Sequence, residues 1–138
     1  MQNQHTVTAS IGSALYRTEI SNEKHLIISD ESAEVGGGDQ GLAPTDLLAS
    51  SLAACTAITL RMYANRKELE VTGIDVKVSV VNQTVEKAVK TLIKREIVIN
   101  GNLTDEQRQR MLQIANVCPI HKTLTNPIEV VTELGESI

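Results

Sequence analysis

The sequence predicts an α+β fold, and its pattern of apolar residues supports this class. Segments in which apolar and polar residues alternate occupy the N-terminal third, and a long apolar helical segment follows over 47–60. Alternation returns at 74–80 and 92–100, before a second helical pattern and a last short strand. With 138 residues the chain has the usual size of one domain, so we expect a single domain over 1–138.

The N-terminal third predicts short strands at 7–11, 15–20 and 25–28, with turn-forming residues between them. The glycine-rich segment 36–41 that follows predicts a flexible loop. This loop lacks the lysine and the serine or threonine that a phosphate-binding loop carries after its last glycine.

A long helix is predicted to begin at Pro44, because proline suits the first helical turn. From Leu47 to Leu60 its residues are apolar on nearly every side, so it should be buried on most sides. One small domain can hardly cover such a helix, and we therefore expect a homodimer in which the helix packs against its symmetry mate. The 14-residue apolar segment is shorter than the about 20 residues that a membrane span needs, so we expect no membrane segment.

The C-terminal half predicts further strands and a helix. The segment 74–80 alternates most clearly, and 92–100 forms the next strand. Thr104, with Gln107 three residues later, is a capping-box pattern that opens a helix. The segment from Pro127 to Thr132 predicts a final strand.

Composition excludes some classes of partner. The formal charge of −4 and the pI near 5.4 argue against binding to a phosphate backbone. The chain has two tyrosines and no phenylalanine or tryptophan, so it lacks the rings on which single-stranded nucleic acid stacks. The polar N-terminus does not resemble a secretory signal, and we expect a cytoplasmic protein whose thiols stay reduced unless they do chemistry.

The first of the two cysteines, Cys55, lies in the apolar helix. It is about nine residues into that helix, where the dipole no longer acts, and apolar neighbours raise a thiol pKa. A reactive Cys55 therefore needs a cation from elsewhere. Arg17 is a better candidate than Arg61, which lies about 120° around the same helix. From the residues alone, a packed core cysteine is the simpler interpretation.

The second cysteine, Cys118, precedes Pro119, which predicts that it caps a short helical turn ending near Leu124. Free amide groups at such a position lower a thiol pKa, so local context makes Cys118 the more acidic thiol. His121 either assists this thiolate or is simply a hydrogen-bonded imidazole. The candidate zinc ligands form only an incomplete set, which consists of Cys118, His121 and Cys55. We therefore expect no metal and no cofactor.

The segments around both cysteines resemble motifs of one known family. Pro44 to Ala49, together with Leu52 to Ala57, resembles the first cysteine motif of the OsmC/Ohr family of thiol peroxidases. The sequence from Cys118 to His121 resembles that family's second motif, a cysteine followed by proline. The resemblance covers nearly the whole chain. Three more segments are similar to an uncharacterised redox-protein branch of the family: 16–19, 35–37 and 60–64.

This resemblance implies an OsmC-like intertwined homodimer with antiparallel sheets packed around long buried central helices, and with active sites at the subunit interface. It implies a thiol peroxidase for organic hydroperoxides. Cys55 would attack the hydroperoxide and become a sulfenic acid, and Cys118 would condense with it to a disulfide. A dithiol reductant would restore both thiols.

The resemblance also assigns supporting residues. An arginine from the N-terminal strands, here Arg17, would polarise the reactive thiolate, and a glutamate after the motif's proline would hold that arginine. Thr45 stands at the glutamate position and Asp46 follows it, although a shift of one residue rotates a side chain by about 100° and Asp46 can cap the helix instead. Glu19 and His121 complete the supporting candidates.

A non-catalytic dimer of the same fold, acting as a small-ligand binder or a structural protein, is the alternative. The proline after Cys118 favours chemistry, since packing alone does not require it. Thr45 in place of glutamate favours the alternative.

Overall fold

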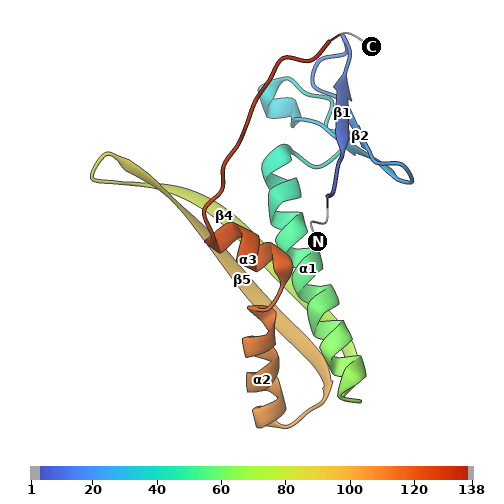
Figure 1. The fold of residues 1–138 in the computed structure, drawn as a ribbon, viewed down its shortest axis with the longest axis vertical. Coiled ribbons are helices and arrows are strands. Elements are labelled where there is room, and N and C mark those ends of the chain that lie inside the picture. The colour runs from blue at the N-terminus through green and yellow to red at the C-terminus, as the bar shows by residue number, and fades with distance from the viewer. Residues whose placement is uncertain (1–3, 137–138) are drawn as a thin grey trace. The chain divides into compact units, whose positions relative to one another are not determined.

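The computed structural model describes residues 4–136, which Figure 1 draws as a ribbon. The chain contains two compact units, which divide between Ser50 and Ser51 inside the long helix α1 (Pro44–Arg66). It combines antiparallel sheets with helices, and this confirms the predicted α+β class. The expectation of a single domain over 1–138 stays a prediction.

The first unit contains a three-stranded antiparallel sheet in the order β1-β2-β3. Its strands are β1 (Thr8–Ile11), β2 (Thr18–Ser21) and β3 (Leu26–Ser29), close to the predicted segments. Strand β2 begins later than predicted because Leu15 adopts a positive φ of 43°, a turn conformation that ends extended structure. A single 3-10 turn, η1 (Ala33–Val35), follows the sheet.

Side-chain and backbone contacts hold the glycine-rich loop that was predicted to be flexible. Asp30 is buried, and its carboxylate accepts hydrogen bonds from the backbone N–H groups of Glu31 and Gln40. At Gly37 a Cβ would lie only 2.0 Å from the Glu31 carbonyl oxygen, so the loop closes this tightly only with glycine there. The buried carboxylate therefore holds the C-terminal end of the loop, at Gln40, against the end of β3.

Helix α1 (Pro44–Arg66) begins as predicted at the proline. Asp46 Oδ2 accepts a hydrogen bond from the Ala43 backbone N–H at 3.1 Å, so Asp46 does cap the first turn. In length and composition, with a mean hydropathy of 1.4, α1 could cross a membrane, so the shortness of its apolar core is no argument against a span. Core helices of soluble proteins have the same length and composition, so this one helix is weak evidence for a membrane span.

Only one stripe of α1 is buried within the described chain. It recurs every four residues, as a helix face does, and consists of Leu52, Thr56, Leu60 and Ala64. Burial on most sides, which the sequence predicted, is not found in this single chain: Ile58 is 54 % exposed and Met62 is 66 % exposed. The outer faces of the helix therefore lack a partner in the described residues of one chain.

The second unit is built on a long antiparallel hairpin of β4 (Glu70–Val85) and β5 (Ala88–Asn102). Both strands extend beyond the predicted segments and meet at a two-residue turn. Its central residues Glu86 and Lys87 both have positive φ, as a type I′ turn requires. Glu86 and Lys87 do not predict this turn, because asparagine or glycine usually occupies such positions.

Helices cover one face of this hairpin. Helix α2 (Asp105–Ala115) begins at the predicted capping box, in which Thr104 and Gln107 exchange hydrogen bonds. Helix α3 (Pro119–Thr125) follows after a short break. The core joins α1, α2 and the hairpin, and its fully buried members are Leu60, Ala64, Met111 and Ala115.

The predicted final strand is wrong. Residues 127–132 have no strand pairing, and Val130 and Val131 are 83 % and 80 % exposed. A strand exists only where its backbone pairs with another, and the described residues of one chain supply no partner for this segment.

Candidate redox site

The fold brings the two cysteines together within the second unit. Cys55 lies in the middle of α1 and is half-buried, whereas Cys118 caps α3 and is fully buried. Their side chains are hydrogen-bonded to each other. Residues 63 positions apart in the sequence thus form one thiol pair.

Burial is the main cause that raises the pKa of the Cys55 thiol. The hydrogen bond with Cys118, which favours the protonated form of Cys55, and the negative charge of a Cys118 thiolate raise this pKa further. The backbone N–H of Ile120 and the hydroxyl of Thr59 act in the opposite direction but do not outweigh these effects. Among the described residues, no cation contributes to the Cys55 pKa.

The pKa of Cys118 is lowered, although burial of its side chain acts to raise it. Hydrogen bonds donated by the Cys55 thiol and by the backbone N–H groups of His121 and Ile120 outweigh burial, because they stabilise the thiolate. The His121 N–H reaches Cys118 Sγ at 3.4 Å, as the predicted cap geometry requires. These directions of the two pKa values agree with the local sequence context, and the prediction that Cys118 is the more acidic thiol stays a prediction.

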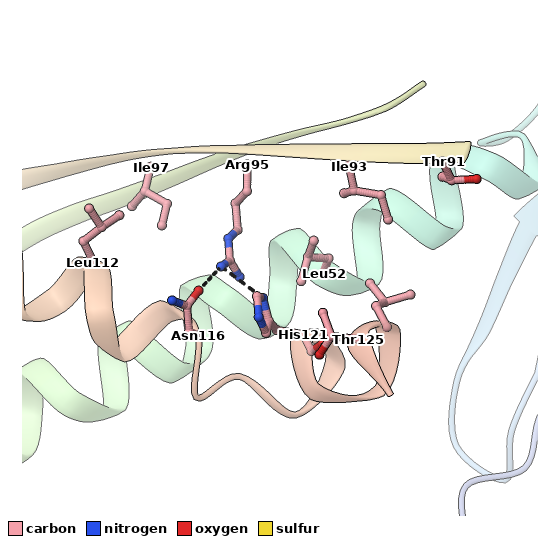
Figure 2. Close-up of a pocket in the computed structure, with 10 residues that line it drawn as sticks. Leu52, Thr91, Ile93, Arg95, Ile97, Leu112, Asn116, His121 and Thr125 are labelled. Carbon is pink, nitrogen blue, oxygen red and sulfur yellow. Dashed lines mark hydrogen bonds between the residues drawn. The ribbon is translucent and has the colours of Figure 1, made fainter. Parts of the chain in front are cut away.

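Arg95, which the sequence analysis did not single out, connects the elements around the thiols (Figure 2). From β5 its guanidinium donates to Thr56 Oγ1 (3.1 Å), the Ala115 carbonyl oxygen (3.2 Å), Asn116 Oδ1 (2.8 Å) and His121 Nδ1 (3.3 Å). Because arginine can only donate, this contact requires Nδ1 of the His121 ring to accept. The His121 side chain is thus hydrogen-bonded to Arg95, while its backbone N–H donates to Cys118 Sγ.

A cavity of about 470 Å³ lies beside this cluster (Figure 2). Arg95, Asn116 and His121 supply polar groups to its wall. Most of the remaining wall is aliphatic and comes from α1, β5, α2 and α3: Leu52, Ile93, Ile97, Leu112 and Leu124. An apolar cavity with a few convergent polar groups is typical of a site for a small organic molecule.

The other predicted supporting residues belong to the first unit. Arg17 donates to Gln40 Oε1 (3.0 Å) and to Glu19 Oε1 (3.2 Å), and both members of the Arg17–Glu19 ion pair are exposed. Thr45 and Asp46 lie in the exposed first turn of α1. Roles for these residues at the thiol pair stay predictions.

The comparison with family models identifies the class of protein. The model described as "OsmC-like protein" matches residues 36–133, a segment that includes both cysteines. The chain therefore belongs to the OsmC-like family, as its motifs suggested. A search of curated proteins found no match.

Solved structures with the same fold agree with this assignment. One is a protein from Psychrobacter arcticus that is described as an osmotic stress induced and detoxification response protein. It is 26 % identical to this chain, and the TM-score is 0.72. The match covers 89 % of this chain and 90 % of the Psychrobacter chain. An OsmC-like protein from Mycoplasma pneumoniae is 19 % identical, with a TM-score of 0.76 and coverage of 90 % and 89 %. A protein from Legionella pneumophila, described as organic hydroperoxide resistance protein OsmC, is 21 % identical, with a TM-score of 0.66 and coverage of 90 % and 92 %.

Proposed function

We propose that this protein is a thiol-dependent peroxidase that reduces organic hydroperoxides to alcohols. The observation that carries the proposal is the pairing of Cys55 with Cys118 in one site. Arg95, which lines a cavity with several aliphatic residues, connects that cavity to the residues next to both cysteines. Membership of the OsmC-like family supports it, and so does the name of the Legionella protein, which refers to organic hydroperoxide resistance.

In the proposed reaction Cys55 is the attacking thiol, because it is partly exposed while Cys118 is fully buried. The hydrogen bond between the thiols allows the Cys118 thiolate to take the proton of Cys55, which leaves Cys55 as the nucleophile. Cys55 Sγ attacks the terminal peroxide oxygen, the O–O bond breaks, and the leaving alkoxide takes up that proton and departs as an alcohol. Cys55 is then a sulfenic acid.

Cys118, again a thiolate, attacks the sulfur of this sulfenic acid. The S–O bond breaks, the hydroxide takes up a proton and leaves as water, and a Cys55–Cys118 disulfide forms. A dithiol reductant supplies two electrons and two protons to restore the pair. The site needs no cofactor or metal for these steps.

We further propose that the protein works as a homodimer with interface active sites. The exposed apolar residues Ile58 and Met62 on α1 and the unpaired segment 127–132 are surfaces that a second copy would cover. Arg17 would then act as the cation for Cys55, with Thr45, Asp46 and Glu19 around it. A cytoplasmic location fits a pair of thiols that must be kept reduced between turnovers.

A non-catalytic, ligand-binding dimer is the second candidate. Two observations favour it: Thr45 replaces the glutamate of the family motif, and the pKa of Cys55 is raised. A less acidic thiol is a smaller fraction thiolate at neutral pH and reacts more slowly.

Peroxide consumption separates these candidates. Purified protein is mixed with cumene hydroperoxide and excess dithiothreitol, and the remaining peroxide is measured over time beside a protein-free control. The peroxidase proposal expects catalytic consumption of many equivalents and slower consumption of hydrogen peroxide. Consumption no faster than in the control would reject peroxidase activity in favour of the ligand-binding dimer.

A further inference from the structure

We propose that Arg95 is a positioning residue, which holds the Cys118 segment against α1 and thereby sets the rate at which Cys118 attacks the sulfur of Cys55. The inference rests on the cysteine pairing of the proposed function, but it does not depend on which oxidant modifies Cys55.

The acceptors that Arg95 binds lie next to both cysteines. Asn116 lies two residues before Cys118, and His121 lies three residues after it. The Arg95 guanidinium therefore forms hydrogen bonds on both sides of this cysteine in the sequence. A third bond goes to Thr56 on α1, the residue that follows Cys55. Arg95 is thus bonded to both elements that carry the thiols.

Arg95 occupies a position where packing would favour an aliphatic residue. It lies between Ile93 and Ile97 in the alternation of β5, and all three line the same cavity. Among residues 4–136 no carboxylate lies within ion-pair distance of its guanidinium, so the half-buried charge is satisfied by neutral acceptors alone. Such a cation costs folding free energy that no ion pair offsets.

Two guanidinium nitrogens of Arg95 make four hydrogen bonds, which the flat, rigid fork of arginine permits. Lysine would keep the charge, but its ammonium has three donors and no planar fork, so it cannot hold all four acceptors in this arrangement. Arg95→Lys therefore separates a positioning role from a role of charge alone.

The attack of Cys118 on Cys55 can be measured without peroxide by using Ellman's reagent, an aromatic disulfide. In the first phase Cys55 attacks the reagent, a mixed disulfide forms, and one coloured aryl thiolate leaves. In the second phase the Cys118 thiolate attacks Cys55 Sγ, and the bond to the aryl sulfur breaks with its electron pair. A second aryl thiolate leaves at a rate that does not depend on reagent concentration.

We expect Arg95→Gln and Arg95→Lys to slow the second phase by about tenfold to a hundredfold, because small misplacements of reacting atoms cost this much. The first phase should slow less than the second, since Cys118 enters it only as the base that takes the proton of Cys55 and not as the attacking atom. Arg108→Lys is the matched control, because Arg108 also binds two carbonyl oxygens, those of Ile99 and Gly101, away from the thiols. It should leave both phases unchanged.

Asn116→Ala provides a milder variant that removes one of the four acceptors from an exposed residue. It should slow the second phase less than the Arg95 variants do while the unfolding temperature stays near that of wild type. This variant keeps the test informative even where an Arg95 variant folds poorly.

A second phase that stays at the wild-type rate in the Arg95 and Asn116 variants would overturn the proposal. Equal slowing of both phases together with a lowered unfolding temperature would also overturn it, in favour of a general structural role. A wild-type protein that closes the disulfide in this assay but leaves cumene hydroperoxide untouched would reject the peroxidase function alone.

Discussion

The middle of α1 and the first turn of α3 each present one thiol, and the two places give it different properties. Cys55, inside a helix, has no free backbone N–H of its own turn to bind, and burial raises its pKa. Cys118, at a helix start, receives backbone N–H groups that lower its pKa despite complete burial. Solvent exposure and a low pKa therefore occur on different thiols: Cys55 is the more exposed and Cys118 the more acidic. In the proposed reaction the interaction between the two thiols lets them act together.

Replacement of either thiol should have the largest effect. Cys55→Ser should reduce hydroperoxide turnover to background, because the accessible nucleophile is lost. Cys118→Ser should still reduce about one equivalent of hydroperoxide and then stop if the reductant cannot reach the Cys55 sulfenic acid. Rapid-mixing measurements of peroxide consumed per protein check both outcomes. Multiple turnovers by the Cys55→Ser protein would contradict the assignment of Cys55 as the attacking thiol and of Cys118 as the resolving thiol.

Disruption of the proposed dimer interface on the outer faces of α1 should have the next largest effect. We expect a homodimer at micromolar concentration, and Met62→Asp should dissociate it, because a charge would be buried at an apolar interface. Light scattering measures the mass of each. Asn65→Asp, also exposed on α1 and already polar, is the control. A wild-type monomer, or a Met62→Asp dimer of unchanged affinity, would contradict the proposed interface.

The acidity difference between the thiols predicts how each ionises with pH. A lowered pKa means that the thiolate of Cys118 appears at a lower pH than that of Cys55. In Cys118→Ser the negative charge beside Cys55 is removed, so the pKa of Cys55 should fall relative to wild type. Ultraviolet thiolate absorbance against pH measures both. A Cys55 pKa that rises in this variant would refute the coupling between the thiols.

Two threonines on α1 sharpen the comparison, because each contacts a different thiol. The Thr56 hydroxyl donates to the Leu52 carbonyl oxygen at 2.7 Å and also helps to lower the pKa of Cys118, and the Thr59 hydroxyl helps to lower that of Cys55. Thr56→Val should raise the pKa of Cys118, and it should cost about 1–3 kcal/mol of stability because an Arg95 donor loses its partner. Thr59→Val should instead raise the pKa of Cys55.

Thiol titration and urea unfolding of both threonine variants measure these effects. An exchange of the two results, with Thr56→Val acting on Cys55, would show that the assignment of hydroxyls to thiols is wrong.

The smallest effect is expected at Asp46, which separates a helix cap from a catalytic carboxylate. Asp46→Ala should lower stability by about 0.5–1 kcal/mol, because the bond to the Ala43 N–H is lost. If the residue only caps α1, hydroperoxide turnover per folded protein should stay at the wild-type level. Lost turnover with unchanged unfolding in urea would instead give Asp46 the role of the family's glutamate.

Local signals in the sequence predicted the parts of the fold that depend on near neighbours. Pro44, the Thr104–Gln107 capping box and the cap at Cys118 were each recognisable because their hydrogen bonds join residues a few positions apart. The family motifs then pointed to the pairing of both cysteines, which local reasoning had left open.

Features that depend on distant residues were not predictable in the same way. The segment 127–132 has a strand-like composition, but strand pairing needs a partner that its own residues do not reveal. Arg95 carried one signal that was overlooked: it is a charged residue in the inward register of a strand, between Ile93 and Ile97. The apolar sequence of α1 predicts burial on most sides, but the other described residues of one chain leave the outer faces of this helix exposed.

The most direct test of the central claim, that Cys55 is oxidised first and Cys118 resolves it, is to locate the sulfenic acid. Cys118→Ser protein is treated with one equivalent of cumene hydroperoxide in the presence of dimedone, and peptide mass spectrometry locates the adduct. We predict an adduct on Cys55, and no adduct in Cys55→Ser protein treated in the same way. An adduct on Cys118 in the Cys55→Ser protein, with none on Cys55 in the other variant, would contradict the claim and reverse the two roles.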